Sequence, residues 1–145
     1  YIWTKADNYS LVITPKTNTA RYDSDIISNP PTQTGALLDP TTARERFFSL
    51  LGQLGIKFSE NISFQQKERY LEVSGLKVNG VSQEEASILE LEFSLMSGQI
   101  PIVTNSPNTK TMSVMFDKNG NILDFEAQGT INSLTRQQVE YPLSK

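Results

Sequence analysis

Carboxylates are the side chains through which this sequence could carry out acid–base chemistry. They occur as close pairs at Glu84-Glu85, Glu90/Glu92 and Asp124/Glu126. On a strand, Glu90 and Glu92 would share one face roughly 7 Å apart, from the rise per residue, which is a spacing that suits glycosidases. An acid–base pair needs two carboxyl groups with different pKa values, which requires one to be buried and the other exposed. Nothing in the sequence indicates such a difference between these two residues. We therefore expect a solvated strand face, and a carboxylate-only hydrolase is the weakest of three hypotheses for this chain.

The composition removes most other catalytic chemistry. The 145 residues include no cysteine and no histidine, which excludes thiolate metal sites and Ser-His-Asp or Cys-His catalysis within the chain. The net charge is −3 and no dense Lys/Arg run occurs, so a nucleic-acid surface is not indicated. No apolar run approaches the roughly 20 residues that span a bilayer. We expect a protein without a cofactor that acts by binding or regulation.

The segment Asp117-Lys118-Asn119-Gly120-Asn121 has the residue types of a calcium loop. An EF-hand loop needs glycine at position 6 and a bidentate glutamate at position 12. Counted from Asp117, the glycine falls at position 4 and Gln128 at position 12. Asn-Gly is instead a strong signal for a hairpin turn. We therefore predict a hairpin here and no metal site.

One helix is strongly indicated, over residues about 41–54. Asp39-Pro40 and the following threonines supply capping chemistry, and Gly55 can end the helix. The apolar residues recur at i, i+4, i+7 and i+11, which is one helical face; they are Ala43, Phe47, Leu50 and Leu54. We expect this face to pack on sheet residues that include Leu89, Leu91, Phe93, Val114 and Phe116.

Strands are predicted on both sides of this helix. The first covers residues 9–14 and is followed by a long polar loop, residues 16–40. Later runs alternate with period two, with a turn at Asn79-Gly80 and a hairpin over 112–126 closed by Asn119-Gly120. Residues 82–96 fit a strand from about 87, but the spacing of Ser82 and Glu85 and the apolar residues after them also fit a helix. The fold class expected is α+β, with one main helix on a twisted antiparallel sheet of four to six strands.

The domain expected is a single one over 1–145, with an N-terminal strand and long loop in 1–36 and a helix-plus-sheet core in 37–130. The chain starts at Tyr1 without methionine, which we interpret as an excised or processed piece. The tail 131–145 is interpreted as an extended segment, which can be the start of a further repeat. Most aromatic residues are assigned to core packing rather than to a binding face.

The order of these elements resembles PepSY-like and YycH/YycI-like extracytoplasmic domains of bacteria. The resemblance covers residues about 37–127 and is carried by Leu54-Gly55-Ile56 at the helix end, Gly98-Gln99-Ile100-Pro101-Ile102, and the hairpin Val114 to Ile122. It implies a non-catalytic module outside the cytoplasmic membrane, tethered by an anchor that this sequence does not contain. It also implies a protein partner at the cell envelope, such as a sensor-kinase ectodomain or a protease.

Two binding hypotheses follow. The first is a regulatory module that binds a protein partner through an edge strand, because unpaired edge groups can accept an added strand. The residues proposed for that contact are Gly98, Gln99, Ile100, Pro101 and Ile102. The alternative is a small-molecule or glycan-binding domain in which the 16–40 loop acts as a lid, and it requires a pocket of roughly 300 Å³ or more lined by aromatic residues.

Overall fold

The sheet is antiparallel throughout and larger than the sequence indicated. The computed structural model describes residues 2–5, 9–28, 30–31, 33–60, 62–101 and 112–129. Within them the strands are β1 (Ile2–Lys5), β2 (Tyr9–Thr14), β3 (Thr19–Asp23), β4 (Ile62–Ser74), β5 (Lys77–Gly80), β6 (Ile88–Ser97), β7 (Ile100–Pro101), β8 (Met112–Asp117) and β9 (Ile122–Gln128). Their order is β1-β2-β3-β9-β8-β6-β4-β5, and β7 pairs with the end of β6. The predicted α+β fold is confirmed, but four to six strands was too low a number.

The predicted helix is confirmed as α1 (Pro40–Gln53), and both of its ends are explained by local chemistry. The Asp39 carboxylate accepts hydrogen bonds from the backbone N–H groups of Thr41 and Thr42, which have no partner inside the helix. At the other end Gly55 has φ +77°. The Ile56 N–H donates to the Leu51 carbonyl and the Gly55 N–H to the Gly52 carbonyl, which together form a Schellman motif.

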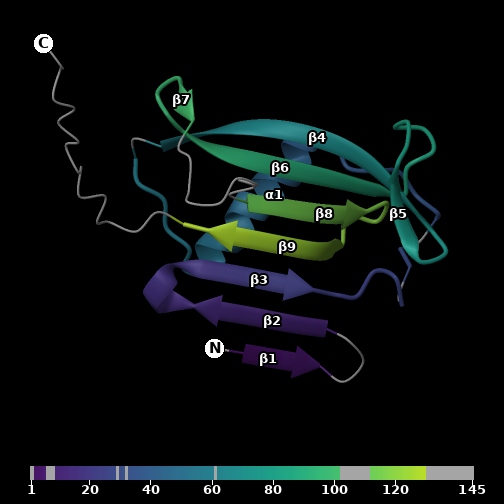
Figure 1. Cartoon of the computed structure of the whole chain (residues 1–145), viewed down its shortest axis with the longest axis horizontal. Helices are drawn as coiled ribbons and strands as arrows, with labels where there is room; N and C mark the ends of the chain where they lie inside the picture. Colours follow the sequence, from purple (N-terminus) through teal and green to yellow (C-terminus); the bar gives the residue numbers. More distant parts are fainter. Residues whose placement is uncertain are drawn as a thin grey trace, which may run out of the picture.

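The helix packs on one face of the sheet and lies behind its middle strands in Figure 1. Ala43, Phe47 and Leu51 are fully buried. The ring of Phe47 lies 5.8 Å from the rings of both Phe93 on β6 and Phe125 on β9. Two members of the predicted stripe, Leu50 and Leu54, are only half-buried against this core. The sheet residues expected beneath the helix are all fully buried: Leu89, Leu91, Phe93, Val114 and Phe116.

The loop predicted over residues 16–40 is wrong in its first part. Residues 15–17 form the short 3₁₀ helix η1 (Pro15–Thr17), and β3 follows at once. β3 pairs with β2 and also with β9, more than a hundred residues later. Its apolar side chains are Ala20 and Tyr22, and Tyr22 stacks on Phe125 with ring centroids 6.0 Å apart. Pairing with a distant strand stabilises a strand this short. Its own residues are mostly polar, so the local pattern predicted a loop.

The turn predicted at Asn79-Gly80 is also wrong. The chain reverses at Gly75-Leu76, where Gly75 has φ +60°, and residues 77–80 pair back on β4. The Asn-Gly signal is overridden because the register places Leu71 opposite Gly80 and keeps the Leu71 side chain buried. Residues 82–96 follow the strand alternative, with β6 starting at Ile88. The Ser82 hydroxyl does donate to the Glu85 carboxylate at 2.8 Å, but in a turn and not in a helix.

The position of Phe47 leads to a stability prediction. Phe47→Ala should lower the free energy of unfolding by about 3–5 kcal/mol, because it removes a fully buried ring between two others. Urea denaturation monitored by circular dichroism measures the change. Glu45→Ala, an exposed change on the same helix, is the control and should stay within about 0.5 kcal/mol of the wild type. Equal denaturation midpoints for Phe47→Ala and the wild type would contradict this packing.

Candidate functional site

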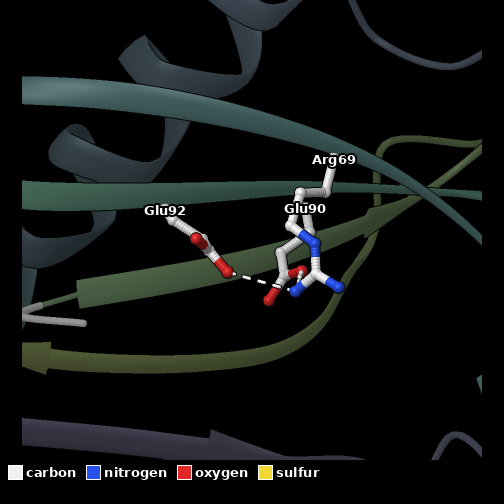
Figure 2. A network of polar contacts seen from close by, with 3 residues as sticks. All are labelled: Arg69, Glu90 and Glu92. Atoms are coloured by element: carbon white, nitrogen blue, oxygen red, sulfur yellow. Dashed lines mark hydrogen bonds and ion pairs between the residues drawn. The ribbon is translucent and has the colours of Figure 1, made fainter. Parts of the chain in front are cut away.

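The sheet face away from the helix carries an ion-pair network that joins β4 and β6. Arg69 Nη1 lies 3.1 Å from Glu90 Oε2 and 3.2 Å from Glu92 Oε1. Figure 2 shows both carboxylates on the same side of the Arg69 guanidinium, with Glu90 next to it and Glu92 farther away, and with the helical ribbon behind the strands. The register explains the contact, because Arg69 is directly opposite Glu90 on the neighbouring strand.

The expectation that Glu90 and Glu92 form a solvated face is wrong. The Glu90 side chain is 2% exposed and that of Glu92 15%, whereas Arg69 is 45% exposed. Both carboxylates turn toward one guanidinium, so they compensate its charge together. The two carboxylates share one cation and therefore form an ion-pair network that links β4 and β6. The sequence could not show this burial, because Arg69 lies 21 residues before Glu90 and meets it only through strand pairing.

A second group of charges lies on the same face, across β3 and β9. Asp23 is directly opposite Asp124, and Arg21 is directly opposite Glu126. Arg21 Nη2 is 3.6 Å from Asp23 Oδ2. Burial raises the pKa of Asp124 to about 6, and the charge of Asp23 adds to this shift while Arg21 opposes it. Like charges directly opposite on neighbouring strands destabilise the pair, so this seam of the sheet is weakened by its own side chains near neutral pH.

The other predicted acidic and turn residues have structural roles. Glu84 and Glu85 are exposed in the turn before β6. Asp117 ends β8, and its Oδ1 accepts hydrogen bonds from the N–H groups of Asn119 and Asn121 at 2.8 Å. Gln128 stands at the far end of β9, so residues 117–128 form a hairpin and not a calcium-binding loop. Among the described residues, no cluster of three or more acidic groups is arranged to hold a metal ion.

The segment proposed for a protein partner is a tight hairpin in the structure. Gly98 has φ +62°, and β7 pairs Ile100 with Ser97 and Pro101 with Met96. The outermost strands of the described sheet are β1 and β5, so β7 is a short addition to β6 rather than an outer edge. Ile102 and the tail 131–145 lie outside the described residues. The role of this segment in binding a partner stays a prediction.

A polar cavity, which the sequence alone does not reveal, opens where β3 ends beside the β8–β9 turn. Its volume is about 300 Å³. The sheet and the turn contribute one wall, and the chain after β3 contributes the other. The lining residues are Tyr9, Tyr22, Ser24, Pro30, Pro31, Asp117, Asn121, Ile122 and Leu123. The available signals were two tyrosines in short strands and the Pro30-Pro31 pair, and only the fold brings them together.

A second, apolar cavity lies between the helix and the N-terminal strands. It has a volume of about 230 Å³ and is lined by Leu11, Tyr22, Leu50, Leu54, Ile122 and Phe125. Leu50 and Leu54 are the members of the predicted helix stripe that the sheet does not cover completely. Tyr22 and Ile122 line both cavities, so the apolar and polar spaces adjoin at these two side chains.

Comparisons with known proteins returned no match: no family model, no curated protein and no solved structure is similar to this chain at a significant level. Over the part of the chain that the structure describes, no helix has both the length and the apolar character needed to cross a bilayer.

The buried end of the ion-pair network predicts a coupled effect on stability. Arg69→Met should lower the free energy of unfolding by about 2 kcal/mol, because it removes the guanidinium that compensates the buried carboxylate of Glu90; the loss is below that of a fully buried pair since Arg69 is half exposed. Adding Glu90→Gln should recover more than half of the loss. Lys77→Met, an exposed charge removal on β5 opposite Ser74, is the control. Chemical denaturation of the four chains checks this, and no recovery in the double variant would contradict it.

The carboxylate seam predicts a pH-dependent effect. The carboxyl group of Asp124 has a higher pKa in the folded chain than its ordinary value of 3.8, so it binds its proton more tightly there. The stabilisation that protonation provides is therefore present at acidic pH and is lost as the pH rises through about 6. Asp124→Asn should raise the free energy of unfolding by about 1 kcal/mol at pH 7.5, a value discounted for solvent screening, and its advantage should vanish near pH 4. Urea titrations over this range test it, with Glu84→Gln in the exposed turn before β6 as control; a gain independent of pH would refute the assignment.

Proposed function

We propose that this chain is a non-catalytic binding module that takes a small organic ligand in the polar cavity between Tyr9, Tyr22 and the Pro30-Pro31 segment. The observation that carries the proposal is the cavity itself, about 300 Å³ and lined by two tyrosines. This volume lies at the lower end of the range for small-molecule sites. It also meets the requirement that the sequence analysis placed on the ligand-binding alternative.

The walls of the cavity suit recognition of a small ring-containing molecule. Tyr9 and Tyr22 supply flat apolar faces with hydroxyl groups at their tips, which is how aromatic residues combine packing with hydrogen bonding. Pro31 is buried, and a proline pair holds that wall at fixed φ angles. Ser24 is 4% exposed and adds a hydroxyl group to the lining of the cavity. A preformed wall reduces the entropy lost when a ligand binds.

The hydrogen bonds of Asp117, the one acidic residue that lines the cavity, favour binding without catalysis. The Asp117 carboxylate accepts two backbone hydrogen bonds at Oδ1 and one from Asn121 Nδ2 at Oδ2, all of which maintain the turn. A general base must be free to accept the proton of its substrate. The carboxylate is therefore a recognition group and a support for the turn.

The lid expected over residues 16–40 becomes a smaller element in this proposal. Residues 19–23 belong to the sheet, so only the chain after β3 can cover the cavity. It is fixed at its start by hydrogen bonds within the turn, where the Asp25 N–H donates to Asp23 Oδ1 at 2.9 Å. Gln33 also accepts a hydrogen bond at its carbonyl from Lys118 Nζ at 3.3 Å. The cover is thus tied to the β8–β9 turn on the opposite wall.

A protein partner is a second proposal, and it rests on the resemblance and on the outer strand of the sheet. All four residues of β5 are exposed, and Leu76 in the preceding turn is 83% exposed. An exposed edge with apolar side chains is a surface to which another strand can add. An extracytoplasmic, membrane-anchored regulator would use such an edge. Pull-down from an envelope fraction with wild type and Leu76→Asp tests it: a protein retained equally by both chains counts against β5.

The ligand-binding proposal predicts saturable binding at one place. In a titration followed by ¹H–¹⁵N NMR, a panel of monosaccharides, aromatic alcohols and amines should include probes that shift the amide signals of Tyr22, Ser24 and Asn121. Tyr9→Ala should weaken that binding at least tenfold. Tyr70→Ala, which removes a half-buried tyrosine from β4 away from the cavity, should leave it unchanged. Absence of any saturable shift at these amides across the panel would refute the proposal.

A further inference from the structure

The two cavities differ sharply in chemistry although they share side chains. The larger one is lined by hydroxyl, amide and carboxylate groups together with tyrosine and proline. The smaller one is lined by aliphatic and aromatic residues from β2, β3, β9 and the helix end. Tyr22 and Ile122 belong to both. A ligand that passes these two side chains would meet an apolar environment at one end and a polar environment at the other.

The apolar space arises from how the helix lies on the sheet. The rings of Phe93 and Phe125 hold α1 over the middle strands through Phe47. β2 and β3 extend to one side of the helix, as Figure 1 shows. Leu50 and Leu54 on the flank of the helix then face Leu11 across a gap. An apolar cavity of about 150 Å³ is enough to bind benzene, so about 230 Å³ accepts an aromatic ring or a short branched alkyl group.

The polar end is electronegative. Asp117 lines it, and its Oδ2 accepts one hydrogen bond from within the described residues, which leaves room for a second donor. Ser24, which also lines the cavity, follows Asp23 directly in the sequence, and Asp23 is opposite Asp124. Burial raises the pKa of the Tyr22 hydroxyl, and Tyr9 and the charges of Asp124 and Asp23 raise it further, which indicates a negative potential at the shared wall.

Asp117 is the only charged side chain among the residues that line the polar cavity, and the neighbouring cations, such as Arg46 beside Gly120 in the β8–β9 turn, lie outside that lining. Arg21 pairs with Asp23 at 3.6 Å on the face of the sheet away from the helix, which is also the face of Asp124, so it offsets part of the charge of these two acids and leaves Asp117 as the acid inside the cavity. Lys118 Nζ donates to the carbonyl of Gln33 at 3.3 Å, outside the lining. An ammonium group is therefore favoured at this end over a carboxylate, by the Coulomb attraction that a partly desolvated acid exerts.

We propose that the adjoining cavities form one site for a small amphiphilic amine, with its apolar ring between Leu11, Leu50 and Leu54 and its ammonium group beside Asp117. This inference rests on the proposed function, because it uses the same polar cavity and names the ligand class. A fatty acid or an aryl carboxylate would bring a negative charge to Asp117 and is disfavoured. A free sugar would fill the polar end only.

Four matched probes test the ligand class on the whole chain at pH 7.5 and low salt. They are 2-phenylethylamine, 2-phenylethanol, 3-phenylpropanoate and ethylamine, each titrated by ¹H–¹⁵N NMR. The phenylethylamine should shift amide signals in both cavities and bind at least tenfold more tightly than the carboxylate. Its affinity should fall as salt is raised, since salt screens the charge contribution. Ethylamine, which has no apolar part, should bind at least tenfold more weakly.

A cavity-filling variant tests the apolar end. Leu54→Phe should weaken 2-phenylethylamine at least fivefold by occupying the space between helix and sheet, while Leu76→Phe, a matched change at an exposed site, should have no effect. If the alcohol and the carboxylate bind the polar cavity as tightly as the amine, or if Leu54→Phe leaves binding unchanged, the inference is wrong while the proposed function stands. If none of the four probes shifts the amide signals of either cavity while compounds of the wider panel still do, the inference alone fails. If neither the four probes nor the wider panel shifts these signals, both the inference and the proposed function are refuted.

Discussion

The fold depends on the contact of the Phe47 ring with Phe93, on which it stacks, and with Phe125, which it meets edge to face. These three rings come from α1, β6 and β9, and they hold the helix across strands that are not neighbours in sequence. Burial of large apolar side chains is the main favourable term in folding, and here it also sets geometry. Because the helix is placed over the middle of the sheet, the N-terminal strands are left to one side, where β2 and β3 bound the apolar cavity.

The opposite face of the sheet combines charged pairs with a smaller apolar cluster, in which Leu71 and Ile88 are buried and pack with Met115. Arg69 compensates Glu90 and Glu92 between β4 and β6, whereas the facing carboxylates of Asp23 and Asp124 oppose each other between β3 and β9. One seam of the sheet is therefore stabilised by an ion pair and the other is weakened by like charges. The weakened seam is the one that connects the N-terminal strands to the rest of the sheet, and it borders the end of β3 from which the cavity wall departs.

This arrangement relates the proposed binding site to the stability of the sheet. The polar cavity needs β3, the β8–β9 turn and the chain after β3 to meet. Asp117 contributes to that meeting point twice, since its carboxylate maintains the turn and also lines the cavity. A ligand that contacts both walls would add stabilisation to a part of the sheet that its own charges weaken, as any ligand that binds only the folded state does.

Local sequence was enough to predict the helix with both of its ends and the hairpin at Asp117, and it favoured a strand from about residue 87 while a helix also fitted that segment. Each has a local cause: the Asp39 cap, Gly55 with its positive φ, and apolar alternation over ten residues. Strand pairing and packing in the folded chain were needed to reveal β3, the turn at Gly75, the burial of Glu90 and the two cavities. All four depend on pairing or packing between residues far apart in the chain, such as Tyr22 with Phe125 and Arg69 with Glu90. The register between distant strands is the one that buries the most apolar surface on one face of the sheet. That quantity depends on both strands, so the side-chain pattern of one segment cannot predict it.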